Sequence, residues 1–208
     1  AYSIKDEEYN YQYVDNKWES ARLRVNDGDI ITVGDLIYSA LVGSANNAVE
    51  ALVRASGVPR EEFIAKMNKA VVGWGAVNTN FIEPTGLSPD NVSSAADYAI
   101  ITKEVLNHPI IQKASITKEY KFLTINTKKA HRIKNTNIMA RDTASYHING
   151  LKTGYLNEAG HCLMVRGKMA NGDNIIVVTM GGGVKSVNIF ETGELLKYGL
   201  TKNNNSKL

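Results

Sequence analysis

The sequence predicts an α+β fold in which an antiparallel sheet packs with a helical lobe. Two observations support this prediction. Apolar residues recur at helical spacing in segments between residues 32 and 107, whereas several segments between 119 and 180 alternate with a period of two. Helices and strands are therefore grouped in separate parts of the chain, which is typical of α+β proteins and not of alternating βα units.

The first helices carry clear start and stop signals. Thr32-Val-Gly-Asp35 resembles a capping box and opens an apolar helix that Gly43 is expected to end. A second helix is predicted over 45–55. Pro59 then suits the first turn of a third helix, because its missing N–H has no partner to lose there.

A fourth helix and the loop before it are also marked. Residues 73–92 hold two of the four prolines and several glycines, which indicates a long loop. Ser94-x-x-Asp97 caps a helix that we expect to run to about Asn107. It stops before Pro109, since the residue before a proline avoids the helical conformation.

Strands are predicted on both sides of the helical segments. Residues 1–31 are rich in tyrosine and charge and alternate in short stretches, which predicts exposed antiparallel strand. The later strands are expected over 119–124, 152–155, 160–168 and 175–180. Asn171-Gly-Asp173 is expected to form the hairpin turn between the last two. A closing helix over 187–198 is expected to stop at Gly199.

Length and organisation favour one domain. The 208 residues fit a single large domain or two closely packed lobes. We expect one domain over 1–200, with a helical lobe over about 32–110 and a sheet lobe built from 1–31 and 119–200. Residues 201–208 are predicted to form a polar tail.

Composition excludes several classes of protein. The chain has 24 basic and 21 acidic residues, and a net charge of +3 does not predict a nucleic-acid-binding protein. No apolar run approaches the roughly 18 residues of a membrane span. Cys162 is the only cysteine, so a disulfide framework and a cysteine-based zinc cluster are excluded. Ala1–Asp15 contains no apolar segment of the kind found in secretory signal peptides.

Two short motifs carry residue types suited to chemistry. Lys152-Thr153-Gly154 is predicted at a strand edge, where an ammonium and a hydroxyl can bind a carboxylate and a glycine admits a peptide backbone. Taken alone, it is also consistent with an ordinary strand start. Ser44-Ala45-Asn46 lies between two helices and by itself indicates a helix cap, and the same pattern recurs at Ser186-Val187-Asn188.

Several stretches in order resemble one family. The stretches in question are Gly28-Asp29-x-x-Thr-Val-x-Asp-Leu36, Ser44-Ala-Asn-Asn-Ala48, Glu83-Pro-Thr-Gly-Leu87, Ser93-Ser-Ala-Ala-Asp97, Asn135-Thr-Asn137, Gly150-Leu-Lys-Thr-Gly-Tyr155 and Leu195-Leu-x-Tyr-Gly199. With them, the sequence between 25 and 200 resembles the D-alanyl-D-alanine carboxypeptidases, which are low-molecular-mass penicillin-binding proteins. The resemblance implies the fold of penicillin-binding proteins and serine β-lactamases.

The resemblance also implies a function. A serine attacks the penultimate D-alanine of a peptidoglycan stem peptide, terminal D-alanine leaves, and water hydrolyses the acyl-enzyme. Penicillins acylate the same serine. No metal or organic cofactor is implied. The implied location is outside the cytoplasmic membrane, with membrane association only through segments not in this sequence.

Roles for individual residues follow from the same resemblance. Ser44 is implied as a proton relay, and Asn46 as a hydrogen-bond partner of the substrate and the catalytic lysine. Lys152 supplies positive charge and Thr153 binds the terminal carboxylate. A last pair completes the implied site: Gly154 leaves room for the substrate along the strand edge, and the backbone N–H of Tyr155 is an oxyanion donor.

The nucleophile is the departure from the family pattern. The family places Ser-x-x-Lys before Ser-x-Asn, yet Ser115-Ile-Thr-Lys118 is the one such motif here and follows Ser44. Because it leads into an alternating strand instead of an apolar helix, we do not expect Ser115 to be the nucleophile. We expect residue 1 to lie downstream of the true motif.

Other readings stay open from the sequence alone. The first is a non-catalytic relative or inactive fragment, which binds cell-wall peptides but lacks a nucleophile. A Ser-x-x-Lys upstream of Ala1 in the intact protein would distinguish the enzyme from this relative. A β-lactamase is a third reading, and fast release of opened penicillin would indicate it.

Overall fold

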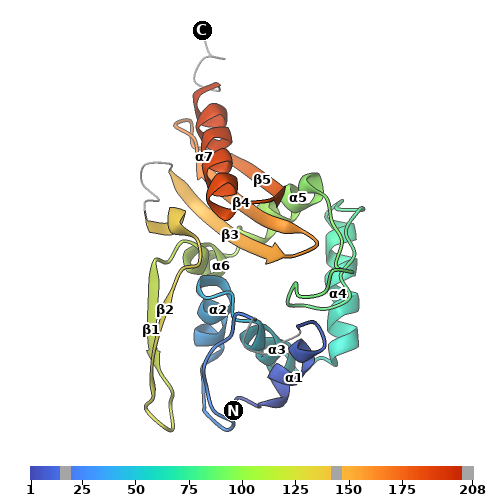
Figure 1. The fold of residues 1–208 in the computed structure, drawn as a ribbon, viewed down its shortest axis with the longest axis vertical. Coiled ribbons are helices and arrows are strands. Elements are labelled where there is room, and N and C mark those ends of the chain that lie inside the picture. Colours follow the sequence, from blue (N-terminus) through green and yellow to red (C-terminus); the bar gives the residue numbers. More distant parts are fainter. Residues whose placement is uncertain (15–19, 142–146, 203–208) are drawn as a thin grey trace. The chain divides into compact units, whose positions relative to one another are not determined.

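The computed structural model describes residues 1–14, 20–141 and 147–202 (Figure 1). The chain folds into two compact units, which are described one at a time. Unit 1 contains Ala1–Ala70, Asn80–Val92 and Thr117–Thr136. Unit 2 contains Val71–Thr79, Ser93–Ile116 and Asn137–Leu208. The prediction of one domain with a helical and a sheet lobe stays a prediction.

Unit 1 combines helices with a two-stranded hairpin. Its elements are α1 (Lys5–Tyr11), α2 (Val33–Val42), α3 (Asn46–Ala55), most of α4 (Arg60–Gly73), β1 (Glu119–Leu123) and β2 (Ala130–Lys134). Strands β1 and β2 pair antiparallel. The core packs small alanines of α3 against larger side chains, including Leu23, Leu36 and Phe122. The short alanine side chains let neighbouring segments approach α3 closely.

Two of the predicted helix starts are confirmed by their caps. The side chain of Thr32 accepts a hydrogen bond from the N–H of Asp35 and begins α2. In unit 2, the side chain of Ser94 accepts one from the N–H of Asp97 and begins α5 (Ala95–Val105). Each cap satisfies a backbone N–H that the helix itself cannot pair.

The predicted strand over residues 1–31 is wrong for its described part. Residues Lys5–Tyr11 form helix α1, and no strand is assigned in 1–14 or 20–31. Ion pairs made by two buried carboxylates hold this short helix: Asp6 pairs with Arg54 at 2.8 Å and Glu7 with Arg22 at 2.7 Å. These partners lie far along the sequence, so local alternation of tyrosines could not reveal them.

Unit 2 is built on a three-stranded antiparallel sheet with strand order β3-β4-β5. The strands are β3 (Ile148–Leu156), β4 (Gly160–Lys168) and β5 (Asn174–Gly182), and the helical elements are α5, α6 (Pro109–Ser115), η1 (Ile138–Arg141) and α7 (Lys185–Lys202). The predicted hairpin turn over 171–173 joins β4 to β5. Helix α7 packs on β4 and β5, with Leu196 in the core (Figure 1).

Three features of the elements differ from the sequence prediction. Helix α6 and strand β2 were not anticipated, and α7 continues through Gly199 to Lys202. An added Cβ at Gly199 would overlap Cδ1 of Ile175 on β5. Gly199 therefore permits close helix–sheet packing and does not end the helix. Residues 203–208 of the predicted tail lie outside the described residues.

No helix in the described part of the chain combines the length and the apolar character needed to cross a bilayer.

Candidate functional site

Ser44 and Asn46 lie together in unit 1, in the tight turn between α2 and α3. Ser44 has a φ of 54°, in the left-handed region that residues other than glycine seldom occupy. Such a conformation costs on the order of 1 kcal/mol and persists only where the surrounding structure holds it. Asn46 is the first residue of α3 and is 9% exposed. The turn therefore presents a strained serine beside a buried amide.

Backbone contacts hold this turn on both sides. The N–H of Ala45 donates to the carbonyl of Ser39 on α2 at 3.2 Å, and the N–H of Asn46 donates to the carbonyl of Ala21 at 2.8 Å. A Cβ at Gly43 would come within 2.7 Å of Ile133 on β2. Gly43 thus lets α2 end directly against the β1–β2 hairpin.

The other four predicted site residues lie together on β3 in unit 2. Within the part of the chain that the structure describes, β3 is an edge strand, so its outer side pairs with no other strand. Lys152 and Thr153 are half-buried, and Gly154 and Tyr155 are exposed. An edge strand is the position at which an extended peptide can add to a sheet.

Burial controls the charge state of Lys152. It lowers the pKa of the ammonium group from 10.5 to about 8, because removal from water disfavours the charged form. The Nζ donates a hydrogen bond to the carbonyl of Thr153 at 2.7 Å. A partly dehydrated cation of this kind attracts an incoming carboxylate more strongly than a solvated surface lysine does.

Neither the backbone conformation nor internal packing requires a glycine at position 154. It pairs with Cys162 on β4, and among the described residues an added Cβ would meet only the Cβ of Cys162, at an ordinary 3.7 Å. Gly150, four residues earlier, is different: a Cβ there would overlap Leu106. Gly150 is thus a packing glycine, whereas a Cβ at position 154 would be tolerated by the protein, so the glycine there suits close approach of a ligand backbone.

Ser115 is placed as a structural residue. It is the last residue of α6, it is 0% exposed, and its Oγ donates to the carbonyl of Gln112 at 2.8 Å. The backbone N–H of Leu151 donates to the same Oγ at 3.4 Å. Lys118, the lysine of the motif, is exposed. These surroundings agree with the prediction that Ser115 is not a nucleophile.

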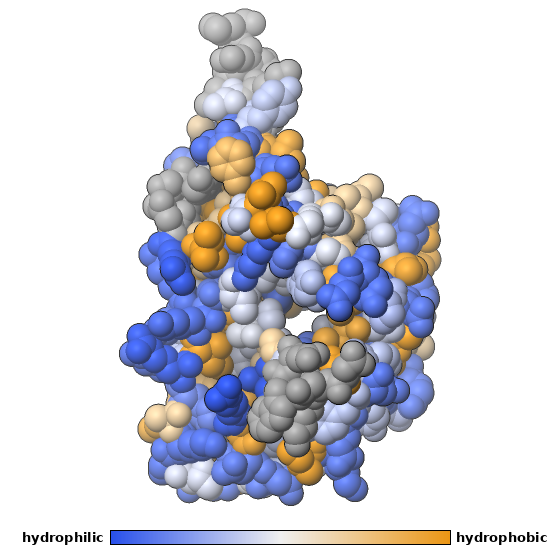
Figure 2. Space-filling view, viewed as in Figure 1, coloured by the Kyte–Doolittle hydropathy of each residue, from blue (hydrophilic) through white to orange (hydrophobic). Residues whose placement is uncertain are grey.

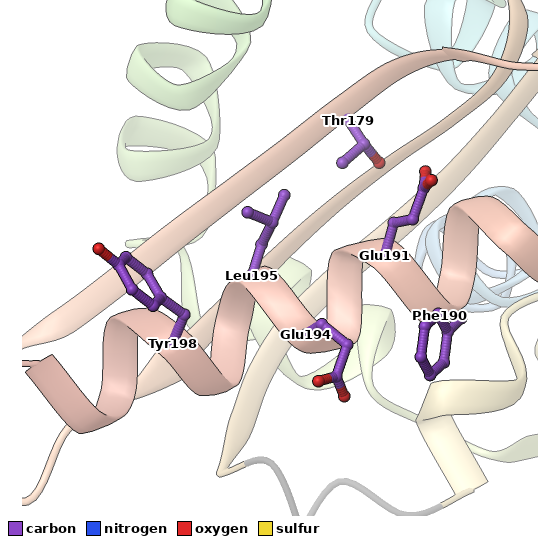
Figure 3. Close-up of a pocket in the computed structure, with 6 residues that line it drawn as sticks. All are labelled: Thr179, Phe190, Glu191, Glu194, Leu195 and Tyr198. Carbon is purple, nitrogen blue, oxygen red and sulfur yellow. The ribbon is translucent and has the colours of Figure 1, made fainter.

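A shallow groove of about 580 Å³ lies elsewhere in unit 2, between α7 and Thr179 of β5 (Figure 3). Its α7 residues are Phe190, Glu191, Glu194, Leu195 and Tyr198. Figure 2 shows apolar surface over α7, and Phe190 is 67% exposed. The groove contains none of the predicted site residues and no nucleophile–base pair.

Comparison with known proteins establishes the family. A sequence model described as D-alanyl-D-alanine carboxypeptidase matches residues 4–183. The chain belongs to this family. Among D-alanyl-D-alanine carboxypeptidases, DacF of Bacillus subtilis is 35% identical over 159 residues, which are 76% of this chain and 40% of the relative. The D-alanyl-D-alanine endopeptidase of Escherichia coli is also 35% identical, over 76% of this chain and 50% of the relative. The chain thus spans about half the length of the curated relatives it matches.

Solved structures confirm the predicted fold. A mutant of a Streptomyces DD-transpeptidase superposes with a TM-score of 0.84 at 23% identity, covering 96% of this chain and 78% of the other. A D-alanyl-D-alanine carboxypeptidase from Mycobacterium tuberculosis gives a TM-score of 0.76 at 22% identity, covering 95% and 73%. At such identities the likeness concerns the fold alone, which is the α+β fold of penicillin-binding proteins.

One buried side chain beside the predicted site was missed by the sequence analysis. Asn47 follows Asn46 directly and is 0% exposed; its Oδ1 accepts one hydrogen bond, and its Nδ2 lies within bonding distance of three acceptors. A second asparagine among the alanines of α3 was the available signal, because a buried polar residue on a packed helix face needs a specific partner.

Proposed function

We propose that the protein is a serine-type D-Ala-D-Ala carboxypeptidase that forms an acyl-enzyme with peptidoglycan stem peptides and is acylated by β-lactams. The observation that carries the proposal is the family match over residues 4–183, because the matched region contains both Ser44-x-Asn46 and Lys152-Thr153-Gly154. The strained turn at Ser44 and the edge position of β3 in the described sheet support it.

Strand β3 is the substrate-binding edge in this mechanism. The peptide lies along it as an added strand, and the small Gly154 admits its backbone. Lys152, held as a partly dehydrated cation, attracts the terminal carboxylate, and the hydroxyl of Thr153 donates a hydrogen bond to it. The N–H of Tyr155 donates to the oxygen that becomes negatively charged in the tetrahedral intermediate.

The α2–α3 turn handles the proton and orients the substrate. A serine of a Ser-x-x-Lys motif, other than Ser115, attacks the carbonyl carbon of the penultimate D-alanine. The C–N bond breaks and its nitrogen takes a proton through the hydroxyl of Ser44, so D-alanine leaves as the free amino acid. Water then hydrolyses the ester, and the serine regains its hydrogen. Asn46 hydrogen-bonds the substrate amide and the lysine of the motif.

The substrate class follows from this chemistry. Both a pentapeptide end and a crosslink offer a peptide bond after D-alanine, and the relatives include proteins named carboxypeptidases and endopeptidases. The free carboxylate sought by Lys152 and Thr153 favours the pentapeptide. Such substrates place the protein's activity outside the cytoplasmic membrane, and the reaction needs no metal or organic cofactor.

Acylation by benzylpenicillin tests the proposed function. The full-length protein is incubated with the antibiotic, its intact mass is recorded, and the modified peptide is mapped. We expect one stoichiometric adduct on a serine followed three residues later by lysine, and slow release of the opened antibiotic. Fast release would indicate a β-lactamase instead.

Two other outcomes would contradict parts of this assignment. No adduct on the folded full-length protein would favour the non-catalytic, peptide-binding relative. An adduct mapped to Ser115 would show that the side chain buried at the end of α6 is the nucleophile after all.

Two glycines of β3 offer a matched pair of alanine variants. In Gly154→Ala, we expect unchanged thermal stability and a roughly 10–100-fold loss in acylation rate, because the new methyl group fits the protein but meets the incoming peptide. In Gly150→Ala, overlap with Leu106 is expected to cost about 1–3 kcal/mol of stability. Thermal denaturation and penicillin acylation of both variants check the prediction. A stability loss at Gly154 would show that packing explains this glycine.

A further inference from the structure

The side chain of Asn47 forms a complete amide-to-peptide pair with Leu23. Its Oδ1 accepts from the N–H of Leu23 at 2.8 Å, and its Nδ2 donates to the carbonyl of the same residue at 2.9 Å. The side chain thus acts on Leu23 as a neighbouring strand would, with one donor and one acceptor. Only an asparagine-like amide supplies both groups at this length.

A buried carboxylate completes the surroundings of Asn47. Its Nδ2 also lies 3.1 Å from Oε1 of Glu7 and 2.9 Å from the hydroxyl of Tyr2. That hydroxyl in turn donates to Glu7 at 2.9 Å, and burial raises the pKa of Tyr2, which keeps it protonated. Arg22 and Tyr11 bind the other oxygen of Glu7. The Nδ2 therefore faces acceptors only.

This network lies beside the strained Ser44 turn. The segment that Asn47 binds through Leu23 also supplies the Ala21 carbonyl, which accepts from the N–H of Asn46 at 2.8 Å. Asn46 thus binds segment 21–23 through its backbone N–H, and Asn47 binds it through its side chain. The left-handed φ of Ser44 lies two residues before Asn46. Loss of the Leu23 pair would loosen the segment and, with it, the turn.

We propose that Asn47 is a positioning residue, which fixes segment 21–23 against the start of α3 and thereby holds Ser44 and Asn46 in their working geometry. The inference deepens the proposed function and rests on it for its effect on acylation. Asn47 itself touches no substrate. A displacement of about 1 Å in a catalytic group can lower a rate about 100-fold, so a positioning residue has a measurable effect.

Asn47→Asp is the sharpest variant. The two side chains have nearly the same shape, but the carboxylate cannot donate to the Leu23 carbonyl and faces the carboxylate of Glu7. In the full-length protein we expect the acylation rate at saturating benzylpenicillin to fall about 10–100-fold. We also expect the amide of Asn46 to exchange its hydrogen at least 10-fold faster, with the amide of Val53 later in α3 unchanged.

Two further variants keep the test decisive. The double variant Asn47→Asp with Glu7→Gln serves if the single variant does not fold. It removes the repulsion between carboxylates but still leaves the Leu23 carbonyl without its donor. We therefore expect the same slower acylation and the same faster exchange of the Asn46 amide. Thr124→Val is the control, since it removes a buried hydroxyl of unit 1 that bonds only within the β1–β2 loop region. It should leave both readouts at their wild-type values.

The possible outcomes test the proposed function and the positioning role of Asn47 separately. A wild-type protein that is not acylated contradicts the proposed function, while the exchange of the Asn46 amide still decides whether Asn47 holds the turn. A wild-type protein that is acylated, with Asn47→Asp variants that keep both the wild-type rate and Asn46 protection, overturns the positioning role. Slower acylation with unchanged Asn46 protection overturns it as well.

Discussion

Lys152→Met is expected to lower kcat/KM for a D-Ala-D-Ala peptide about 100–1000-fold. Methionine keeps the length of the side chain but removes the cation that attracts the terminal carboxylate, and loss of one such group has effects of this size. Steady-state release of D-alanine measures the change. Lys168→Met, at the exposed end of β4, is the matched control and should retain wild-type activity.

Lys152→Met is also expected to raise the free energy of unfolding at neutral pH. The pKa of Lys152 is about 8 in the folded protein against 10.5 for the free side chain, so below pH 8 the fold carries the cost of a dehydrated ammonium. Water still reaches part of this side chain, so we expect a gain of roughly 1–3 kcal/mol and not the full value of the shift. Urea unfolding at pH 7 measures it.

The pH dependence of stability and of kcat/KM gives a second, independent test of the role of Lys152. Between pH 8 and 10.5 the folded protein releases the Lys152 proton before the unfolded chain does, so wild-type stability rises with pH and the advantage of the methionine variant disappears. Over the same range kcat/KM of the wild type falls, because the neutral amine no longer attracts a carboxylate. A flat activity profile through pH 8 would contradict the carboxylate-binding role.

Glu83→Gln is expected to cost about 2–4 kcal/mol of stability. The Glu83 carboxylate is 1% exposed and organises the loop that follows α4 by accepting hydrogen bonds only. The donors are the backbone N–H groups of Thr85, Gly86, Leu87 and Ser88, the hydroxyl of Thr85 and the side chain of Asn91. A glutamine turns an NH₂ group toward some of these donors and leaves them buried without an acceptor.

Denaturant unfolding checks the Glu83 prediction. Asp90→Asn, on the same loop but exposed, neutralises one carboxylate without burying a donor and is expected to change stability by less than about 0.5 kcal/mol. Equal effects of the two variants would show that the loop needs the negative charge alone and not the acceptor geometry.

The elements that the sequence predicts correctly are those with local signals. Thr32 and Ser94 mark helix starts because each cap forms within four residues, and the 171–173 turn selects its hairpin in the same way. Helix α1 escaped prediction because Arg22 and Arg54 supply the partners of its buried carboxylates. Gly199 was misread because the Ile175 side chain that requires it lies 24 residues earlier.

In the candidate site, too, some features could be predicted from the sequence and others could not. The motif residues follow from the resemblance to the carboxypeptidase family, and the sequence predicts a strand over Lys152–Tyr155, which lies within β3. What the sequence could not reveal is conformation and environment, such as the left-handed backbone of Ser44 and the lowered pKa of Lys152. The turn at Ser44 is held in part by the Ala21 carbonyl, and the Asn47 side chain binds Leu23, so both depend on a segment more than 20 residues away.

The interleaving of the two units has a consequence for synthesis on the ribosome. Every residue of this sequence that belongs to unit 1 has been made once Thr136 is added, whereas the sheet and α7 of unit 2 are still to come. Helices α5 and α6, which contact β5 and β3, are made about 35–70 residues before those strands. At ~5–20 residues per second they wait on the order of several seconds for their partners. The described part of unit 1 is thus made before that of unit 2, and no continuous stretch of this sequence contains either unit by itself.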